Sequence, residues 1–324
     1  MEEMDTYLQL KSILEQTYTG DFIERAEQQL QWECGTVFVK SEISIFSKCR
    51  KILENWKLDC SEISNRGNLG GSITAYLMGV SEIDPIAYSL YPEFTFGVNG
   101  KRMPDLELNI PNHLIEVVQR IQTGGAQIKL IPHQEMEHLY HLSKQMGIAL
   151  KDVPCNEPEV LAFFTEKKGG LKKYCKDSIP ELAEASVREM IEVFKPKNFA
   201  HFCKILGLYY KTGSWKGNGE KLVKEERADI DAVISCREDI FEYCLMVGID
   251  RDTAYQITEN VRMGRVFRKR CCQWEDWKRM LLERSTPEWF VHSCELTEYL
   301  FPRAHLVSYM RMHMRMGWFL LYYS

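Results

Sequence analysis

Residues 65–72 read Asn-Arg-Gly-Asn-Leu-Gly-Gly-Ser, and this glycine-rich turn opens the stretch that organises the chain. An apolar run at 73–80 follows and predicts a helix that leaves the turn. Gly67, Gly70 and Gly71 let backbone N–H groups approach a phosphate closely, and Ser72 can cap the helix. The lysine of a Walker A loop is absent, so the pattern also fits an ordinary glycine-rich turn.

Residues 103–110 read Met-Pro-Asp-Leu-Glu-Leu-Asn-Ile and predict a short strand. Asp105 and Glu107 would point to the same face of that strand, because side chains alternate between its two faces. Two carboxylates placed together can hold a divalent metal for phosphoryl chemistry. A half-buried edge strand with an acidic outer face is the alternative, and the turn, helix and acidic strand together favour the functional interpretation.

The composition is that of an ordinary globular protein: of 324 residues, 45% are hydrophobic and 27% are charged. This length predicts two or three domains. The net charge of −5 gives no overall signature of nucleic-acid binding, which would have to come from local basic patches. The acidic N-terminus, the 11 scattered cysteines and the lack of an apolar run of about 18 residues predict a cytoplasmic protein with reduced thiols and no membrane partner.

Apolar spacing and turn signals divide the chain into a mixed first part and a helical second part. We expect strands at 35–39, 103–110 and 128–131, and a helix at 135–146 that ends at Gly147. The polar, lysine-rich segment 166–176 is interpreted as a hinge. Beyond it, helices are expected at 180–194, 198–207, 230–248, 252–264, 274–284, 288–300 and 304–321.

Two further groups of residues suggest binding chemistry. In the basic glycine loop 211–219, Lys211, Trp215 and Lys216 combine positive charge with a ring that could stack on a base. A solvated loop with one packed tryptophan explains this loop equally well. The histidines at 133, 138 and 141 lie beside Glu135 and Glu137, and we interpret them as a solvated helix face rather than a metal site.

Several of these stretches resemble the motifs of a known protein family. Residues 66–76 and 79–85 resemble the Gly-Ser motif of C-family bacterial replicative DNA polymerases, and 103–110 resemble their palm motif. The stretches 212–218, 234–240 and 301–309 are similar to the PolC-type branch of the DNA polymerase III alpha subunit. The matches keep the family's order from about residue 23 to 323, and together they predict a shortened, divergent palm and fingers homologue.

The resemblance implies an α+β fold. Residues 1–165 would form a nucleotidyltransferase-like palm with a small mixed sheet and a reduced or absent thumb, and residues 166–324 a mostly α-helical fingers region. Asp105 and Glu107 would be catalytic residues and Mg²⁺ ligands. DNA, a deoxynucleoside triphosphate and a replisome protein are the implied partners. The nucleotide would be bound by Arg66, Gly67, Gly70, Gly71 and Ser72, and the fingers would contact DNA through Lys211, Trp215, Lys216, Asn218, Arg303 and His305.

This sequence also departs from the family's pattern. Glu107 stands where the family has a second aspartate, and Ile131 stands where it has a third. Asn68 replaces a serine of the glycine motif, and only about 20 residues separate the acidic strand from Lys129, too few for a thumb. Mg²⁺ demands near-ideal octahedral geometry, so we expect its binding to be weak or lost.

Three hypotheses on function follow, and they leave enzymatic activity open. The first is a divergent PolC-type homologue, related to template-directed DNA synthesis, with impaired or lost nucleotidyl transfer and retained nucleotide or DNA binding. The second is an active minimal metal-dependent nucleotidyltransferase that uses Asp105, Glu107 and either Glu135 or Glu137. The third is a non-catalytic replisome interaction scaffold.

Overall fold

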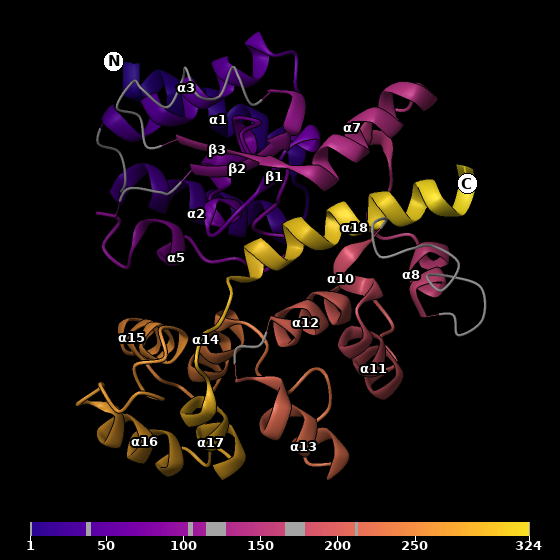
Figure 1. Cartoon of the computed structure of the whole chain (residues 1–324). Helices are drawn as coiled ribbons and strands as arrows, with labels where there is room; N and C mark the ends of the chain where they lie inside the picture. Colours follow the sequence, from indigo (N-terminus) through magenta and orange to yellow (C-terminus); the bar gives the residue numbers. More distant parts are fainter. Residues whose placement is uncertain are drawn as a thin grey trace. The chain divides into compact units, whose positions relative to one another are not determined.

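The computed structural model describes residues 2–36, 40–102, 106–114, 128–165, 179–210 and 213–323 (Figure 1). The chain forms two compact units. Unit 1 consists of Met1–Pro154 and Val307–Arg315, and unit 2 of Cys155–Leu306 and Met316–Ser324. In the described residues, unit 1 combines helices with a small sheet, whereas unit 2 is helical. This arrangement confirms the predicted α+β class.

Unit 1 has a three-stranded mixed sheet of β1 (Ser64–Asn65), β2 (Leu106–Pro111) and β3 (Ile128–His133), in the order β1-β2-β3. β1 pairs with β2 in antiparallel fashion and β2 with β3 in parallel. The helical segments of the same unit are α1 (Glu2–Thr17), α2 (Asp21–Thr36), α3 (Lys40–Asn55), η1 (Cys60–Glu62), η2 (Leu69–Gly71), α4 (Ile73–Leu77), α5 (Glu93–Phe96), η3 (Asn112–Leu114), α7 (Gln134–Met146) and η5 (Leu150–Asp152).

One face of this sheet forms the core of unit 1. Every second residue of β2, from Leu106 to Ile110, is fully buried there together with Ile128 and Leu130 of β3. Helix α3 packs on this face through apolar side chains such as Phe46. Because neighbouring residues of a strand point to opposite faces, Glu107 and Asn109 lie on the other face.

The described helices of unit 2 follow one another along the chain. They are α8 (Pro158–Thr165), α10 (Pro180–Ala183), α11 (Ala185–Phe194), α12 (Phe199–Tyr209), the π-type turn η6 (Trp215–Gly219), α13 (Glu220–Lys224), α14 (Arg237–Met246), α15 (Arg251–Arg262), α16 (Trp274–Glu283) and α17 (Glu288–Leu296). The last helix, α18 (Arg303–Tyr323), contributes its middle to unit 1 and its two ends to unit 2.

Three predicted elements differ most from the structure, and the helix expected over 288–300 ends four residues early, at Leu296. The helix expected over 230–248 begins only at Arg237, because the carboxylate of Asp239 accepts the backbone N–H groups of Ser235 and Cys236 at 2.8 and 3.1 Å and caps the helix there. The helix expected over 180–194 is interrupted at Glu184, whose backbone is extended (φ −64°, ψ 141°). Of the strand expected over 35–39, residues 35 and 36 end α2, and 37–39 lie outside the described residues.

Two further findings concern membrane spans and cysteines in the described residues. Within the described residues, no helix combines the length and the apolar character needed to cross a membrane. The described cysteines are free thiols, and burial raises the pKa of Cys49 to about 12.

Candidate functional site

The glycine-rich turn connects β1 to α4 and is anchored to the sheet. The backbone N–H of Arg66 donates to the carbonyl of Glu107 at 2.8 Å, and Gly67 adopts a left-handed conformation (φ +65°) that favours glycine. Gly71 lies so close to Thr95 and Tyr91 that a Cβ atom there would be 2.7 Å from the Thr95 hydroxyl. Arg66 and Gly67 are half-buried, whereas the rest of the predicted nucleotide-binding set (Gly70, Gly71 and Ser72) is buried.

A carboxylate of the protein itself occupies the N-terminus of the helix that follows this turn. Glu33 of α2 is 1% exposed and accepts hydrogen bonds from the Ser72 hydroxyl at 2.9 Å and from the backbone N–H groups of Ile73 and Thr74 at 2.8 and 3.0 Å. The amide of Gln29 donates to Glu33 and to the carbonyl of Gly71, both at 2.9 Å. The donors at the start of α4 therefore already have acceptors within the protein.

Burial raises the pKa of Glu33, and the hydrogen bonds from Gln29 and the backbone only partly oppose this effect. Our sequence reasoning missed Glu33, although a signal was present. Ala26, Leu30 and Glu33 follow one another at four- and three-residue spacing and are all buried, so an acid lies on the apolar face of a helix.

The register of β2 and β3 defines the surroundings of the acidic strand. Glu107 lies opposite Lys129, and Asn109 lies opposite Ile131. The Lys129 ammonium donates to the Glu107 carboxylate at 2.8 Å. Asp105, the other predicted catalytic residue, lies outside the described residues. On this face, therefore, β3 places a cation, Lys129, beside Glu107 and an aliphatic side chain, Ile131, beside Asn109.

Asn109 is a buried polar residue that our sequence reasoning did not select. Its amide nitrogen donates to the hydroxyl of Tyr309 at 3.2 Å, and the Tyr309 hydroxyl lies 3.4 Å from Nε2 of His133. The amide oxygen of Asn109 is buried and has no hydrogen-bond partner among the described residues. The middle of α18 thus contacts the sheet face that carries Glu107.

Mg²⁺ prefers several carboxylate or carbonyl oxygens in an octahedral arrangement. In the described part of this face, the donors are Glu107, which is paired with Lys129, and the amide oxygen of Asn109. No group of three or more histidine, cysteine, aspartate or glutamate side chains is close enough to bind a metal in the described residues. The described donor set does not fit a site for two Mg²⁺ ions.

Glu135 and Glu137, the alternative third acids, both have histidine partners. Glu135 lies 2.9 Å from His133. Glu137 contacts the rings of His113 and His141, each at 2.7 Å, and accepts the backbone N–H of His113 at 3.2 Å. Burial opposes ionisation of Glu137, but the hydrogen bonds from His113 and His141 lower its pKa. These contacts tie η3 to α7.

The residues predicted to contact DNA occupy different environments in unit 2. Trp215 is buried against Phe194, with ring centres 5.2 Å apart, whereas Lys216 is exposed. Asn218 is buried and exchanges hydrogen bonds with Ser293. Lys211 lies outside the described residues.

Arg303 and His305, at the start of α18, make internal contacts in unit 2. Arg303 forms a two-bond ion pair with Glu242, at 2.6 and 2.7 Å, and lies 3.3 Å from Asp239. His305 is 6% exposed and stacks on Phe301 with ring centres 5.3 Å apart. The structure therefore brings Arg303 and His305 into the packing of unit 2, and their contact with DNA stays a prediction.

Comparisons with known proteins identify the class to which this fold and site belong. The model of the bacterial DNA polymerase III alpha NTPase domain matches residues 6–123, and that of the bacterial DNA polymerase III alpha subunit finger domain matches residues 132–271. The chain therefore belongs to the family of bacterial DNA polymerase III alpha subunits. This result confirms the resemblance inferred from the glycine turn and the acidic strand.

Among its relatives are DNA polymerases III of the PolC type. The chain is 32% identical to that of Lactococcus lactis over 209 residues and 31% identical to that of Bacillus subtilis over 209 residues. The protein of Staphylococcus aureus is 30% identical over 206 residues. These alignments cover 60–61% of the chain but only 13–14% of the relatives. The chain is thus a PolC-type homologue that spans a small part of the length of the relatives it matches.

Proposed function

We propose that this PolC-type homologue binds nucleic acid and nucleotide but has impaired or lost nucleotidyl transfer. The observation that carries the proposal is the register of β2 and β3, which places Lys129 opposite Glu107 and Ile131 opposite Asn109. In the family's pattern a third carboxylate would stand at the position of Ile131. An aliphatic side chain there removes a charge that would hold a metal and align the attacking hydroxyl, and small misplacements are costly in rate.

The contact between Glu107 and Lys129 supports the same proposal but is the weaker argument. Both side chains are partly exposed, at 32% and 66%, and pairs of this kind contribute about 0–1 kcal/mol. A metal held by several carboxylates would displace such a lysine easily. The missing third carboxylate, rather than the lysine, is therefore the decisive change.

Glu33 adds an independent argument about the nucleotide. Its carboxylate already accepts the N–H groups of Ile73 and Thr74, which a triphosphate bound at the glycine turn would otherwise use. A nucleotide would have to bind through other groups of the turn or displace Glu33. We therefore expect nucleotide binding at this turn to be weaker than at a turn whose helix donors are available.

Primer extension with Mg²⁺ or Mn²⁺ tests this proposal. The unmodified chain should extend a labelled primer no better than Asp105→Ala, while still binding the primer–template in an anisotropy assay at low salt. The Ile131→Asp variant should raise extension above that background, because it supplies the missing carboxylate. Ile131→Asn is the uncharged control and should not.

Two results would overturn the proposal. Robust extension that Asp105→Ala abolishes would mean that the chain is an active nucleotidyltransferase. Complete failure to bind primer–template or deoxynucleoside triphosphate at low salt would instead favour a scaffold that has lost its ligands, because phosphate contacts are strongest at low ionic strength.

A further inference from the structure

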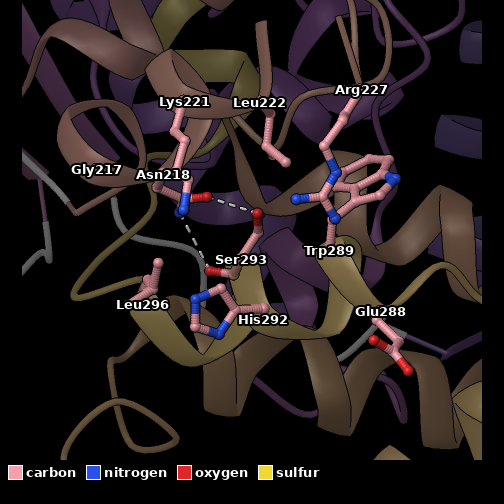
Figure 2. Close-up of a pocket in the computed structure, with 10 residues that line it drawn as sticks. All are labelled: Gly217, Asn218, Lys221, Leu222, Arg227, Glu288, Trp289, His292, Ser293 and Leu296. Carbon is pink, nitrogen blue, oxygen red and sulfur yellow. Dashed lines mark hydrogen bonds between the residues drawn. The ribbon is translucent and has the colours of Figure 1, made fainter. Parts of the chain in front are cut away.

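Unit 2 contains a pocket formed by α17, α13 and the end of the basic glycine loop (Figure 2). It has a volume of about 220 Å³, and its polar and aromatic lining consists of Asn218, Lys221, Arg227, Glu288, Trp289, His292 and Ser293. Pockets that enclose whole drug-sized ligands measure about 300–1,000 Å³. This pocket is therefore suited to a smaller planar group, such as a single nucleobase, rather than a complete nucleoside triphosphate.

Two polar residues of the pocket lining, Asn218 and Ser293, bind each other. The Ser293 hydroxyl donates to the amide oxygen of Asn218 at 2.6 Å (Figure 2). The Asn218 amide nitrogen donates to the carbonyl oxygens of Gly213 and Ser293, at 3.0 and 3.4 Å. Because Asn218 and Ser293 already hydrogen-bond to each other and to Gly213, they have few donors and acceptors left to recognise the edge of a base. A ligand held here would be recognised by stacking and charge, and binding would tolerate different bases.

The remaining groups supply that stacking and charge. Trp289 is half-buried and meets Phe290 edge-on at 5.9 Å between ring centres. Lys221 and Arg227 are exposed at the rim, with side chains 65% and 49% accessible. They share one acidic neighbour, Glu225, at 3.9 and 3.5 Å, and Glu288 is a second acid in the pocket lining, so the attraction for a phosphate is local to the two cations at the rim. Aromatic rings beside a basic rim are typical of single-strand binding sites.

We propose that this pocket binds one nucleotide unit of single-stranded DNA, with the base against Trp289 and its phosphate at Lys221 and Arg227. The choice of nucleic acid as ligand rests on the proposed function, and the place and manner of binding go beyond it. A free nucleoside monophosphate carries the same base and phosphate as one unit of a strand. Competition between the two ligands for the chain distinguishes them.

The test measures binding of fluorescein-labelled oligo(dT) to the full chain by anisotropy at low salt. Trp289→Ala should weaken binding about 5- to 150-fold, the range expected for the loss of one stacked base. Trp289→Phe should restore most of the affinity. Trp318→Ala is the matched control, because Trp318 is also half-buried in unit 2 but does not line the pocket, and it should bind normally. Circular dichroism melting of each variant separates loss of the site from loss of the fold.

A second pair of variants tests the phosphate contact. Lys221→Ala should reduce the slope of log affinity against log salt by about 0.7, the value for one phosphate of a single strand. Lys224→Ala is the matched control, because Lys224 lies on the same helix but pairs with Glu220 at 2.6 Å and lies outside the pocket lining. A 5-iodouracil oligonucleotide should crosslink to the segment 288–292.

The outcomes separate this inference from the proposed function. Unchanged oligo(dT) binding by Trp289→Ala, or binding of primer–template without binding of oligo(dT), would overturn the pocket assignment and leave the proposed function intact. Primer extension by the unmodified chain would overturn the proposed function and leave the pocket assignment to be decided by Trp289→Ala. Competition by thymidine monophosphate as strong as that by an equal concentration of oligo(dT) would assign the pocket to the free nucleotide.

Discussion

At the scale of single residues, Glu33 and Glu82 are both buried acids of unit 1, but their pKa values shift in opposite directions. The donors to Glu33 are uncharged, and burial therefore prevails and raises its pKa. Burial also opposes ionisation of Glu82, but two guanidinium groups overcome it. Arg315 donates to Glu82 at 2.8 and 2.7 Å, Arg311 donates at 3.1 Å, and the pKa of Glu82 is lowered. Charged partners decide which effect prevails.

Replacement of Glu82 by alanine should lower the free energy of unfolding by about 3–5 kcal/mol, the usual result of leaving a buried charge without its partner. Arg315 is 2% exposed and its other donors bind the carbonyl oxygens of Ser61 and Leu150, so it cannot turn toward solvent without losing them. Urea denaturation measures the change. Glu54→Ala is the control, since Glu54 is 55% exposed and its pair with Arg50 should contribute less than about 0.5 kcal/mol.

The same pair gives a pH dependence with a defined sign. Because the folded-state pKa of Glu82 is lowered, its contribution to stability is present above the ordinary carboxyl pKa of about 4.3 and is lost as the pH falls through the folded-state value. The stability difference between the unmodified chain and Glu82→Ala should therefore shrink below about pH 4. A difference that stays constant between pH 7 and pH 3 would contradict this account.

At the scale of elements, a side chain of α2 determines how α4 begins. Glu33 accepts the first backbone N–H groups of α4, and the Ser72 hydroxyl, which donates to Glu33, also accepts the N–H of Ala75 at 3.1 Å. A helix of five residues gains little stability from its own hydrogen bonds. The glycine turn and α4 therefore keep their positions largely because Glu33 satisfies these donors.

Replacement of Glu33 by alanine should lower the free energy of unfolding by about 3 kcal/mol, because two buried N–H groups lose their acceptor. The control is Gln28→Ala, an exposed position on the same helix that should leave stability unchanged. Urea denaturation measures the loss, and hydrogen exchange at residues 73–75 reports it locally. Stability equal to that of the control would mean that water or another acceptor replaces the carboxylate at no cost.

The glycine turn, the acidic strand and most helices of the described chain could be predicted because their signals are local. Glycine spacing, apolar periodicity and a terminal glycine such as Gly147 indicate structure over a few residues. The start of α14 could not be predicted, because the cap at Asp239 competes with a helical pattern that extends further upstream. Among site residues, Glu107 was recognisable from the strand. Its pairing with Lys129 and the approach of Tyr309 to Asn109 depend on register and on distant chain segments.

At the scale of the whole molecule, unit 1 depends on residues from the far end of the chain. Residues 307–315 of α18 belong to it. They supply the Ser308 hydroxyl to Ser64 at 3.0 Å, Tyr309 to Asn109, and two arginines to Glu82. The first part of the chain therefore contains buried polar groups whose partners lie 200 or more residues later in the sequence.

A fragment of residues 1–154 should consequently fail to unfold cooperatively, because Glu82 would be buried without its arginines and the face around Asn109 would lose Tyr309. Thermal melting followed by circular dichroism compares this fragment with the full chain. Addition of a synthetic peptide of residues 303–323 should restore a cooperative transition, and the same peptide with Arg311→Ala and Arg315→Ala should not. A fragment that melts cooperatively at the temperature of the full chain would show that unit 1 needs no help from α18. Restoration by the doubly substituted peptide would attribute the effect to apolar packing rather than to the ion pairs with Glu82.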